Sequence, residues 1–177
     1  SNLTKNLTAQ YAQTIYSVLP KRTGKQMGSD NNRIKAREQA FCLCFSAELA
    51  KDNLDEIIDS YSEEEQVLDF AGELAKGCMS NAEKCDEIIS RYLKKWKLSR
   101  IPKVSKTLLR LSVYQLVFCP DNTMGENPVG IIINDAVRLA KKYATDEDAS
   151  FINGVLGGVA KALESGELTT ESAKADE

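Results

Sequence analysis

The segment from Ala40 to Ala47 is the part of the sequence that most constrains the fold. It reads Ala-Phe-Cys-Leu-Cys-Phe-Ser-Ala and is apolar on nearly every side, while Arg37, Glu38 and Glu48 bracket it. A helix without a polar face belongs in the middle of a core. A buried strand is the alternative, but the flanking Ala, Glu and Leu residues and a length of about 18 residues favour a helix. We therefore expect a central helix covered by other elements.

The rest of the chain shows the three–four spacing of amphipathic helices and no convincing strand. We expect helices over Leu54 to Tyr61, within Glu63 to Trp96, from about Lys103 to Phe118, from Val129 to Tyr143 and from about Ala149 to Leu163. Gly77 is expected to mark a bend and Asn81 an interruption. Asn127-Pro128 has the composition of a helix start. The prediction is an all-α fold of six or seven helices.

The two ends of the chain differ from its middle in composition. Residues 1–19 form a weakly amphipathic pattern, and residues 21–32 have the composition of a linker. We expect 1–32 to be an N-terminal extension, either disordered or a docking helix, followed by a helical domain over 33–163. The acid-rich residues 164–177 are expected to be a disordered tail. No apolar run approaches the length of about 20 residues that spans a membrane, and no secretory signal is evident, which favours a cytoplasmic protein.

Catalysis finds little support in the sequence. The chain has no histidine, the commonest catalytic base and metal ligand. Its five cysteines form no C-x-x-C pair, so reduced and mostly buried thiols are expected. The acidic run from Glu63 to Glu65 suits a helix start better than a metal site. The glycines of the segment 153–158 match no nucleotide-binding fingerprint, and Gly154 and Gly158 are expected to allow close helix packing. We expect no catalytic residue, metal or cofactor.

Two sets of basic residues are the candidates for a binding function. Lys103, Lys106 and Arg110 recur at i, i+3 and i+7, along one stripe of a helix. The second set is Arg33, Lys35 and Arg37. Fixed cations of this kind suit phosphates, and Phe151, Tyr92 and Tyr143 are candidate stacking partners for RNA bases. A plain solvated face remains the alternative for the stripe.

Four motifs resemble the NusB family of transcription antitermination factors, in the family's order and at its spacing. They are Arg33-Ile-Lys-Ala-Arg-Glu-Gln-Ala40, Leu108-Leu-Arg-Leu-Ser-Val-Tyr-Gln-Leu116, Ile133-Asn-Asp-Ala-Val-Arg-Leu-Ala-Lys141 and Phe151-Ile-Asn-Gly-Val-Leu156. Together they extend over about residues 33–163.

The resemblance implies a fold of two small packed helical bundles and a non-enzymatic role in transcription. It implies binding to the boxA element of ribosomal RNA leader transcripts together with the small-subunit ribosomal protein NusE, in a complex with NusA, NusG and RNA polymerase. The RNA-binding positions that it implies are Arg33, Lys35, Arg37, Lys106, Arg110, Glu147 and Phe151.

The chain departs from the family pattern at two positions expected to face the protein partner. Phe45 stands where the family has Tyr, and Ser105 stands where it has an acid. Homodimer formation is a further property of some relatives. Two other functions remain as alternatives, an accessory domain of an RNA methyltransferase and a helical protein–protein scaffold.

Overall fold

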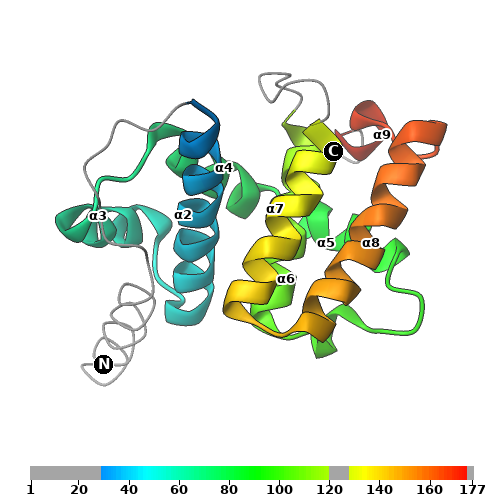
Figure 1. Cartoon of the computed structure of the whole chain (residues 1–177), viewed down its shortest axis with the longest axis horizontal. Helices are drawn as coiled ribbons and strands as arrows, with labels where there is room; N and C mark the ends of the chain where they lie inside the picture. Colours follow the sequence, from blue (N-terminus) through cyan, green and yellow to red (C-terminus); the bar gives the residue numbers. More distant parts are fainter. Residues whose placement is uncertain (1–28, 120–127, 175–177) are drawn as a thin grey trace. The chain divides into compact units, whose positions relative to one another are not determined.

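The structure, a computed structural model, describes residues 29–119 and 128–174, and all regular elements in these ranges are helical (Figure 1). Residues 1–28 of the expected N-terminal extension and the expected helix start at Asn127 lie outside the described residues. The elements are α2 (Ser29–Ala50), α3 (Leu54–Glu64), α4 (Asp69–Ser80), α5 (Ala82–Arg91), α6 (Lys103–Val113), α7 (Pro128–Tyr143), α8 (Asp146–Ser165) and α9 (Thr170–Lys174), with a 3₁₀ turn at Leu98–Arg100 and a π-helical turn at Tyr114–Phe118. The all-α prediction is confirmed, although the eight described α-helices exceed the six or seven expected.

The helices form two compact units, as the resemblance implied. Unit 1 ends at Lys76 and unit 2 begins at Gly77, so the boundary falls within α4. α4 continues through Gly77 without a break in its helical assignment. The interruption expected at Asn81 is confirmed, because α4 ends at Ser80 and α5 begins at Ala82.

Unit 1 is built on α2, whose apolar segment is buried as expected. Phe41 and Leu43 are almost inaccessible to solvent. α2 begins at Ser29, four residues before the expected start of the domain at Arg33. The buried Gln39 holds the connection between α3 and α4, since its amide donates to the carbonyl of Gln66 and its carbonyl accepts from the N–H of Leu68, both at 3.0 Å. A buried polar side chain is thus used, through both its donor and its acceptor group, to position the backbone.

Unit 2 places α6 against α5, α7 and α8, and α7 and α8 form an antiparallel helix pair (Figure 1). The side chains that fill this bundle are apolar and buried: Ile89, Leu108, Leu109, Val113, Leu139, Ile152, Leu156 and Val159. This is the ordinary result of amphipathic helices burying their apolar stripes against one another.

The glycines of α8 differ in their surroundings. A Cβ on Gly158 would lie 3.1 Å from the ring of Tyr92, so the expected close packing is confirmed at this position. A Cβ on Gly154 would meet no atom within 4 Å, so the packing explanation is wrong there. Gly77 also serves packing, because the ring of Tyr114 occupies the space that a Cβ would need.

The start of α8 and the residues that follow its end correct two expectations. α8 begins at Asp146 rather than Ala149, because the hydroxyl of Thr145 accepts from the N–H of Asp148 at 3.1 Å and the Asp148 carboxylate accepts from the N–H of Thr145 at 3.2 Å. The disordered tail predicted for 164–177 is wrong for residues 164–174. Leu168 is buried and its N–H donates to the carbonyl of Ala162, which places α9 after α8. An acid-rich composition did not reveal this single apolar anchor.

None of the described helices combines the length and apolar character needed to cross a bilayer.

Candidate nucleic-acid interface

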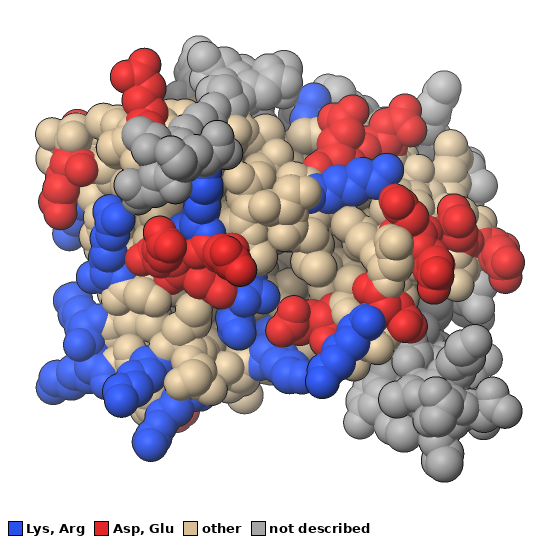
Figure 2. All heavy atoms as spheres, turned by 180° about the vertical axis from the view of Figure 1, so that it is seen from behind, with Lys and Arg blue, Asp and Glu red and all other residues tan. Residues whose placement is uncertain are grey.

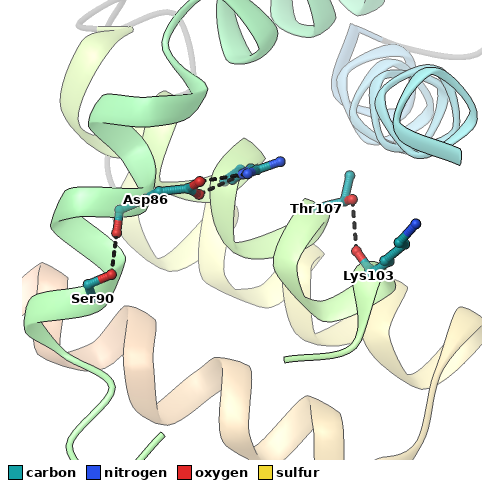
Figure 3. A network of polar contacts seen from close by, with 5 residues as sticks. Asp86, Ser90, Lys103 and Thr107 are labelled. Carbon is teal, nitrogen blue, oxygen red and sulfur yellow. Dashed lines mark hydrogen bonds and ion pairs between the residues drawn. The ribbon is translucent and has the colours of Figure 1, made fainter. Parts of the chain in front are cut away.

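Arg110 on α6 is held by a carboxylate on the neighbouring helix α5. Its Nε and Nη2 atoms each donate to an oxygen of Asp86 at 2.6 Å (Figure 3). The two side chains retain only 14% and 22% of their solvent exposure. Two parallel bonds of this kind fix the plane of the guanidinium. Arg110 is therefore a positioned cation whose charge is already partly compensated.

The two lysines of the predicted stripe are less constrained than Arg110. Lys103 is exposed and Lys106 is half-buried. In the described part of the chain, no hydrogen bond or ion pair joins either ammonium group to another residue. Their backbone groups are engaged instead: the carbonyl of Lys103 accepts from the hydroxyl of Thr107 at 2.8 Å (Figure 3), and the N–H of Lys106 donates to the carbonyl of Pro102 at 2.9 Å. The stripe thus contains two available cations and one that is held by Asp86.

The pair of Arg110 and Asp86 lies beside two buried thiols. Burial raises the pKa of Cys85, as do the neighbouring Cys78 and Asp86, while Arg110 lowers it. All five cysteines are free thiols, and Cys42, Cys44, Cys78 and Cys85 are buried. The expectation of mostly buried thiols is confirmed.

The basic residues of α2 lie in unit 1 and each has a different environment. The guanidinium of Arg33 lies 3.8 Å from the centroid of the Phe70 ring, which is the geometry of a cation–π contact. The ammonium of Lys35 lies 2.5 Å from a carboxylate oxygen of Glu65. Arg37 is buried, with 2% of its surface exposed. Arg33 and Lys35 are half-buried and keep part of their charge at the surface.

Glu147 and Phe151 are brought together at the start of α8. Glu147 is exposed in the first turn, directly after the cap formed by Thr145, and Phe151 is half-buried one turn later. Residues four apart lie on the same face of a helix, so the carboxylate and the ring are neighbours. The other aromatic candidates are engaged within unit 2, since Tyr92 packs on Gly158 and Lys142 lies over the ring of Tyr143.

The two residues expected to face a protein partner differ in accessibility. Phe45 is half-buried and stacks on Phe41 with 5.7 Å between ring centroids. Ser105 is fully buried, and its hydroxyl has no hydrogen-bond partner among the described residues. A direct contact from Ser105 therefore requires its surroundings to open, whereas Phe45 is accessible in part.

A third set of charges escaped the sequence analysis. Trp96 is 60% exposed in the connection between α5 and α6, and the lysines on both sides of it are exposed as well. The signal was present in the sequence as Lys94-Lys-Trp-Lys97, but a tryptophan is ordinarily expected to be mostly buried.

The two units together present a small all-helical protein with basic and aromatic side chains at its surface. Among the described residues, no group of three or more His, Cys, Asp or Glu side chains could hold a metal ion. These features are those of a class of helical binding proteins.

Comparison with known proteins defines the class further. A sequence model described as the NusB family matches residues 34–161. The chain is 36% identical over 137 residues to the transcription antitermination protein NusB of Clostridium novyi, an alignment that spans 74% of this chain and 99% of that protein. It is 37% identical over 142 residues to the protein of the same name from Carboxydothermus hydrogenoformans, spanning 75% of this chain and 95% of that protein. The chain belongs to the NusB family.

Solved structures agree with this assignment. A chain in the crystal structure of the antitermination factors NusB and NusE in complex with dsRNA superposes with a TM-score of 0.64 and 30% identity, covering 73% of this chain and 96% of that chain. Thermotoga maritima NusB superposes with the same TM-score and 31% identity, covering 77% and 97% of the two chains. The resemblance found from four motifs is confirmed by both sequence and fold.

Proposed function

We propose that this chain is a transcription antitermination factor that binds boxA-type RNA of ribosomal RNA leader transcripts together with the ribosomal protein NusE. The observation that carries the proposal is the similarity to a structure of NusB and NusE in complex with dsRNA, over 96% of the matched chain. The alternative of an accessory methyltransferase domain is not favoured, because the matched curated relatives are antitermination proteins and are covered almost completely.

The contacts that we propose follow the environments described above. Lys106 supplies an available cation on α6, and Arg33 and Lys35 supply partly exposed cations on α2. Phe151 offers a ring to a base, and Glu147 lies beside it. Arg110 is held by Asp86 and Arg37 is buried. We therefore propose that both residues support RNA binding mainly indirectly, by holding neighbouring residues in position. We assign the NusE contact to Phe45 and to the surroundings of Ser105.

The wider role remains a proposal as well. The chain is proposed to act without catalysis, in the cytoplasm, where the RNA–NusE complex joins NusA, NusG and RNA polymerase. A homodimer is the competing state of the free protein. Light scattering of the chain with and without NusE measures whether NusE binding converts a dimer into a one-to-one complex.

The proposal is tested by titrating a fluorescently labelled boxA-like RNA with the full chain, with and without purified NusE. We expect NusE to tighten RNA binding, and we expect Lys106→Ala to lower the dependence of log K on log salt by about 0.7, the value for one lost contact with a single strand. Lys141→Ala, which removes an exposed charge from α7, is the matched control and should leave the slope unchanged. If the RNA binds neither to the chain alone nor to the chain with NusE, the proposal is wrong.

The cations of α2 and those of α6 are both proposed to contact the RNA. These cations belong to different units, so the prediction is tested by combination. If Arg33→Ala and Lys35→Ala remove phosphate contacts to the same RNA molecule as Lys106→Ala, the losses in salt slope add in the triple variant. A triple variant with no greater loss than Lys106→Ala alone would contradict the prediction.

A further inference from the structure

The connection between α5 and α6 concentrates positive charge more strongly than any motif that led to the family. Residues 91–103 contain six of the chain's 23 basic residues and none of its 26 acidic ones. The six are Arg91, Lys94, Lys95, Lys97, Arg100 and Lys103, and all are exposed. Because the chain as a whole carries a net charge of −3, this segment is a local positive field on an acidic protein.

These cations differ from Arg110 and Lys35 in having no carboxylate partner. Within residues 29–119 and 128–174, no ion pair or hydrogen bond engages any of the six side chains. Figure 2 shows Lys and Arg side chains gathered at the edge of the molecule that corresponds to the green connection at the right of Figure 1. An uncompensated group of this kind retains its full attraction for an anion.

The connection is also held in a defined conformation. Leu93 and Ile101 are buried at its two ends and anchor it to unit 2. Between them the N–H of Trp96 donates to the carbonyl of Leu93 at 3.1 Å, and the N–H of Arg100 donates to the carbonyl of Lys97 at 2.9 Å. Lys94 has a φ of 50°, a left-handed conformation that turns the chain after α5. The side chain of Trp96, which lies between these two buried residues in the sequence, remains exposed to solvent.

Trp96 gives the charged segment an aromatic surface. The side chain is 60% exposed and lies in sequence between Lys95 and Lys97. Cations that follow a phosphate backbone, combined with an exposed ring on which a base can stack, are the two parts of a single-stranded nucleic-acid site. An acidic protein partner would use the charges but has no particular need of the indole.

We infer that residues 91–103, called here the basic loop, bind single-stranded RNA, with Trp96 stacking on a base and the lysines around it contacting phosphates. The inference rests on the proposed RNA-binding function and adds a contact to it. The ligand is an unpaired segment flanking the core RNA element, because stacking on Trp96 needs a base that is not enclosed in a duplex.

The chain contains a single tryptophan, so tryptophan fluorescence, excited at a wavelength that the six tyrosines do not absorb, reports on the basic loop alone. The full chain is titrated with three probes: a boxA-like RNA, the same RNA extended at either end by about eight unpaired nucleotides, a length within the site sizes of single-strand binders, and an RNA duplex. We expect quenching by an extended RNA and little change with the duplex. Equal quenching by all three probes, or none with the extended RNAs, would overturn the inference.

Substitution separates the ring from the charges. Trp96→Ala should weaken binding of the extended RNA by about five- to a hundredfold, the range for loss of one stacked base, while binding of the short RNA stays unchanged. Trp96→Phe keeps an aromatic ring and should recover most of the loss. Lys94→Gln with Lys97→Gln should lower the salt slope by about 1.4, whereas the control pair Lys141→Gln with Lys161→Gln should not.

The design distinguishes the two proposals. If the short RNA with NusE fails to bind the wild-type chain, the proposed function fails. If it binds normally but Trp96→Ala has no effect on the extended RNA, only the inference about the basic loop fails. Quenching of Trp96 by NusE alone, without RNA, would assign the basic loop to a protein partner and would likewise overturn the inference.

Discussion

Arg110 and the basic loop belong to the same unit and are close in sequence, but their positive charges have opposite environments. The guanidinium of Arg110 is bound by both oxygens of Asp86 and is largely removed from solvent. The cations of the basic loop are exposed and, within the described residues, have no carboxylate partner. One cation is part of the packing between α5 and α6, whereas the others lie outside the core.

The difference indicates that the stability of the fold and the affinity for RNA depend on different cations. A partly buried ion pair cannot lose one member without leaving the other poorly compensated, so its removal is destabilising. Exposed charges contribute little to stability, but each one that meets a phosphate releases a counterion. A motif match selects positions by residue type and therefore does not distinguish these two roles.

The largest expected effect is that of Arg110→Ala on stability. The substitution leaves the Asp86 carboxylate, 22% exposed, without its two hydrogen bonds, and we expect a loss of about 2–3 kcal/mol in the free energy of unfolding. Urea denaturation followed by circular dichroism measures it. Lys106→Ala on the same helix removes a charge with no described partner and should change stability by less than about 0.5 kcal/mol. If Arg110→Ala and Lys106→Ala lower the free energy of unfolding equally, the distinction between the paired Arg110 and the unpaired Lys106 is wrong.

Two glycines provide a similar comparison between a crowded position, Gly77, and an open one, Gly154. Gly77→Ala would place a methyl group in the space taken by the Tyr114 ring, and we expect a destabilisation of about 1–3 kcal/mol from overpacking. Gly154→Ala enters open space on α8 and should raise stability by up to about 1 kcal/mol. Thermal melts of the two variants provide the test. If Gly154→Ala lowers the melting temperature, the expectation that a methyl group fits at this position is wrong.

Asp86→Asn tests whether Arg110 is restrained by its partner. The amide keeps the shape of the carboxylate and one acceptor oxygen, so the expected loss of stability is smaller, about 1 kcal/mol. At the same time Arg110 loses the negative charge of the Asp86 carboxylate. We expect RNA binding to tighten and the salt slope to rise by about 0.7, as for one added phosphate contact. An unchanged slope in RNA titrations would confine Arg110 to a structural role.

Helix positions were predictable from the sequence because the apolar spacing that defines them is local. α3 and α6 begin at the expected residues, and α7 begins at Pro128, one residue before the expected start at Val129. The misplaced boundaries depended on details of a few side chains. Thr145 and Asp148 form a reciprocal cap that starts α8 early, and the buried Leu168 orders a segment whose composition is otherwise acidic.

The candidate site was less predictable than the fold. The spacing of Lys103, Lys106 and Arg110 correctly places them on α6, but it carries no information on Asp86, a residue of another helix. Burial of Ser105 and Arg37 likewise depends on tertiary packing that a motif does not contain. The exposure of Trp96 is opposite to what its residue type predicts, because its neighbours Leu93 and Ile101 provide the apolar anchors instead.

The smallest expected effect is that of neutralising the basic loop on stability, and it is the most direct test of the comparison. The variant Lys95→Gln with Arg100→Gln removes two exposed charges that no described carboxylate compensates, so the free energy of unfolding should change by no more than about 0.5 kcal/mol. If anything, the removal of like charges from a crowded segment should be slightly stabilising at low salt. Urea denaturation at two salt concentrations measures both quantities. A loss approaching that of Arg110→Ala would mean that these cations support the fold, and the division of roles between Arg110 and the basic loop would be wrong.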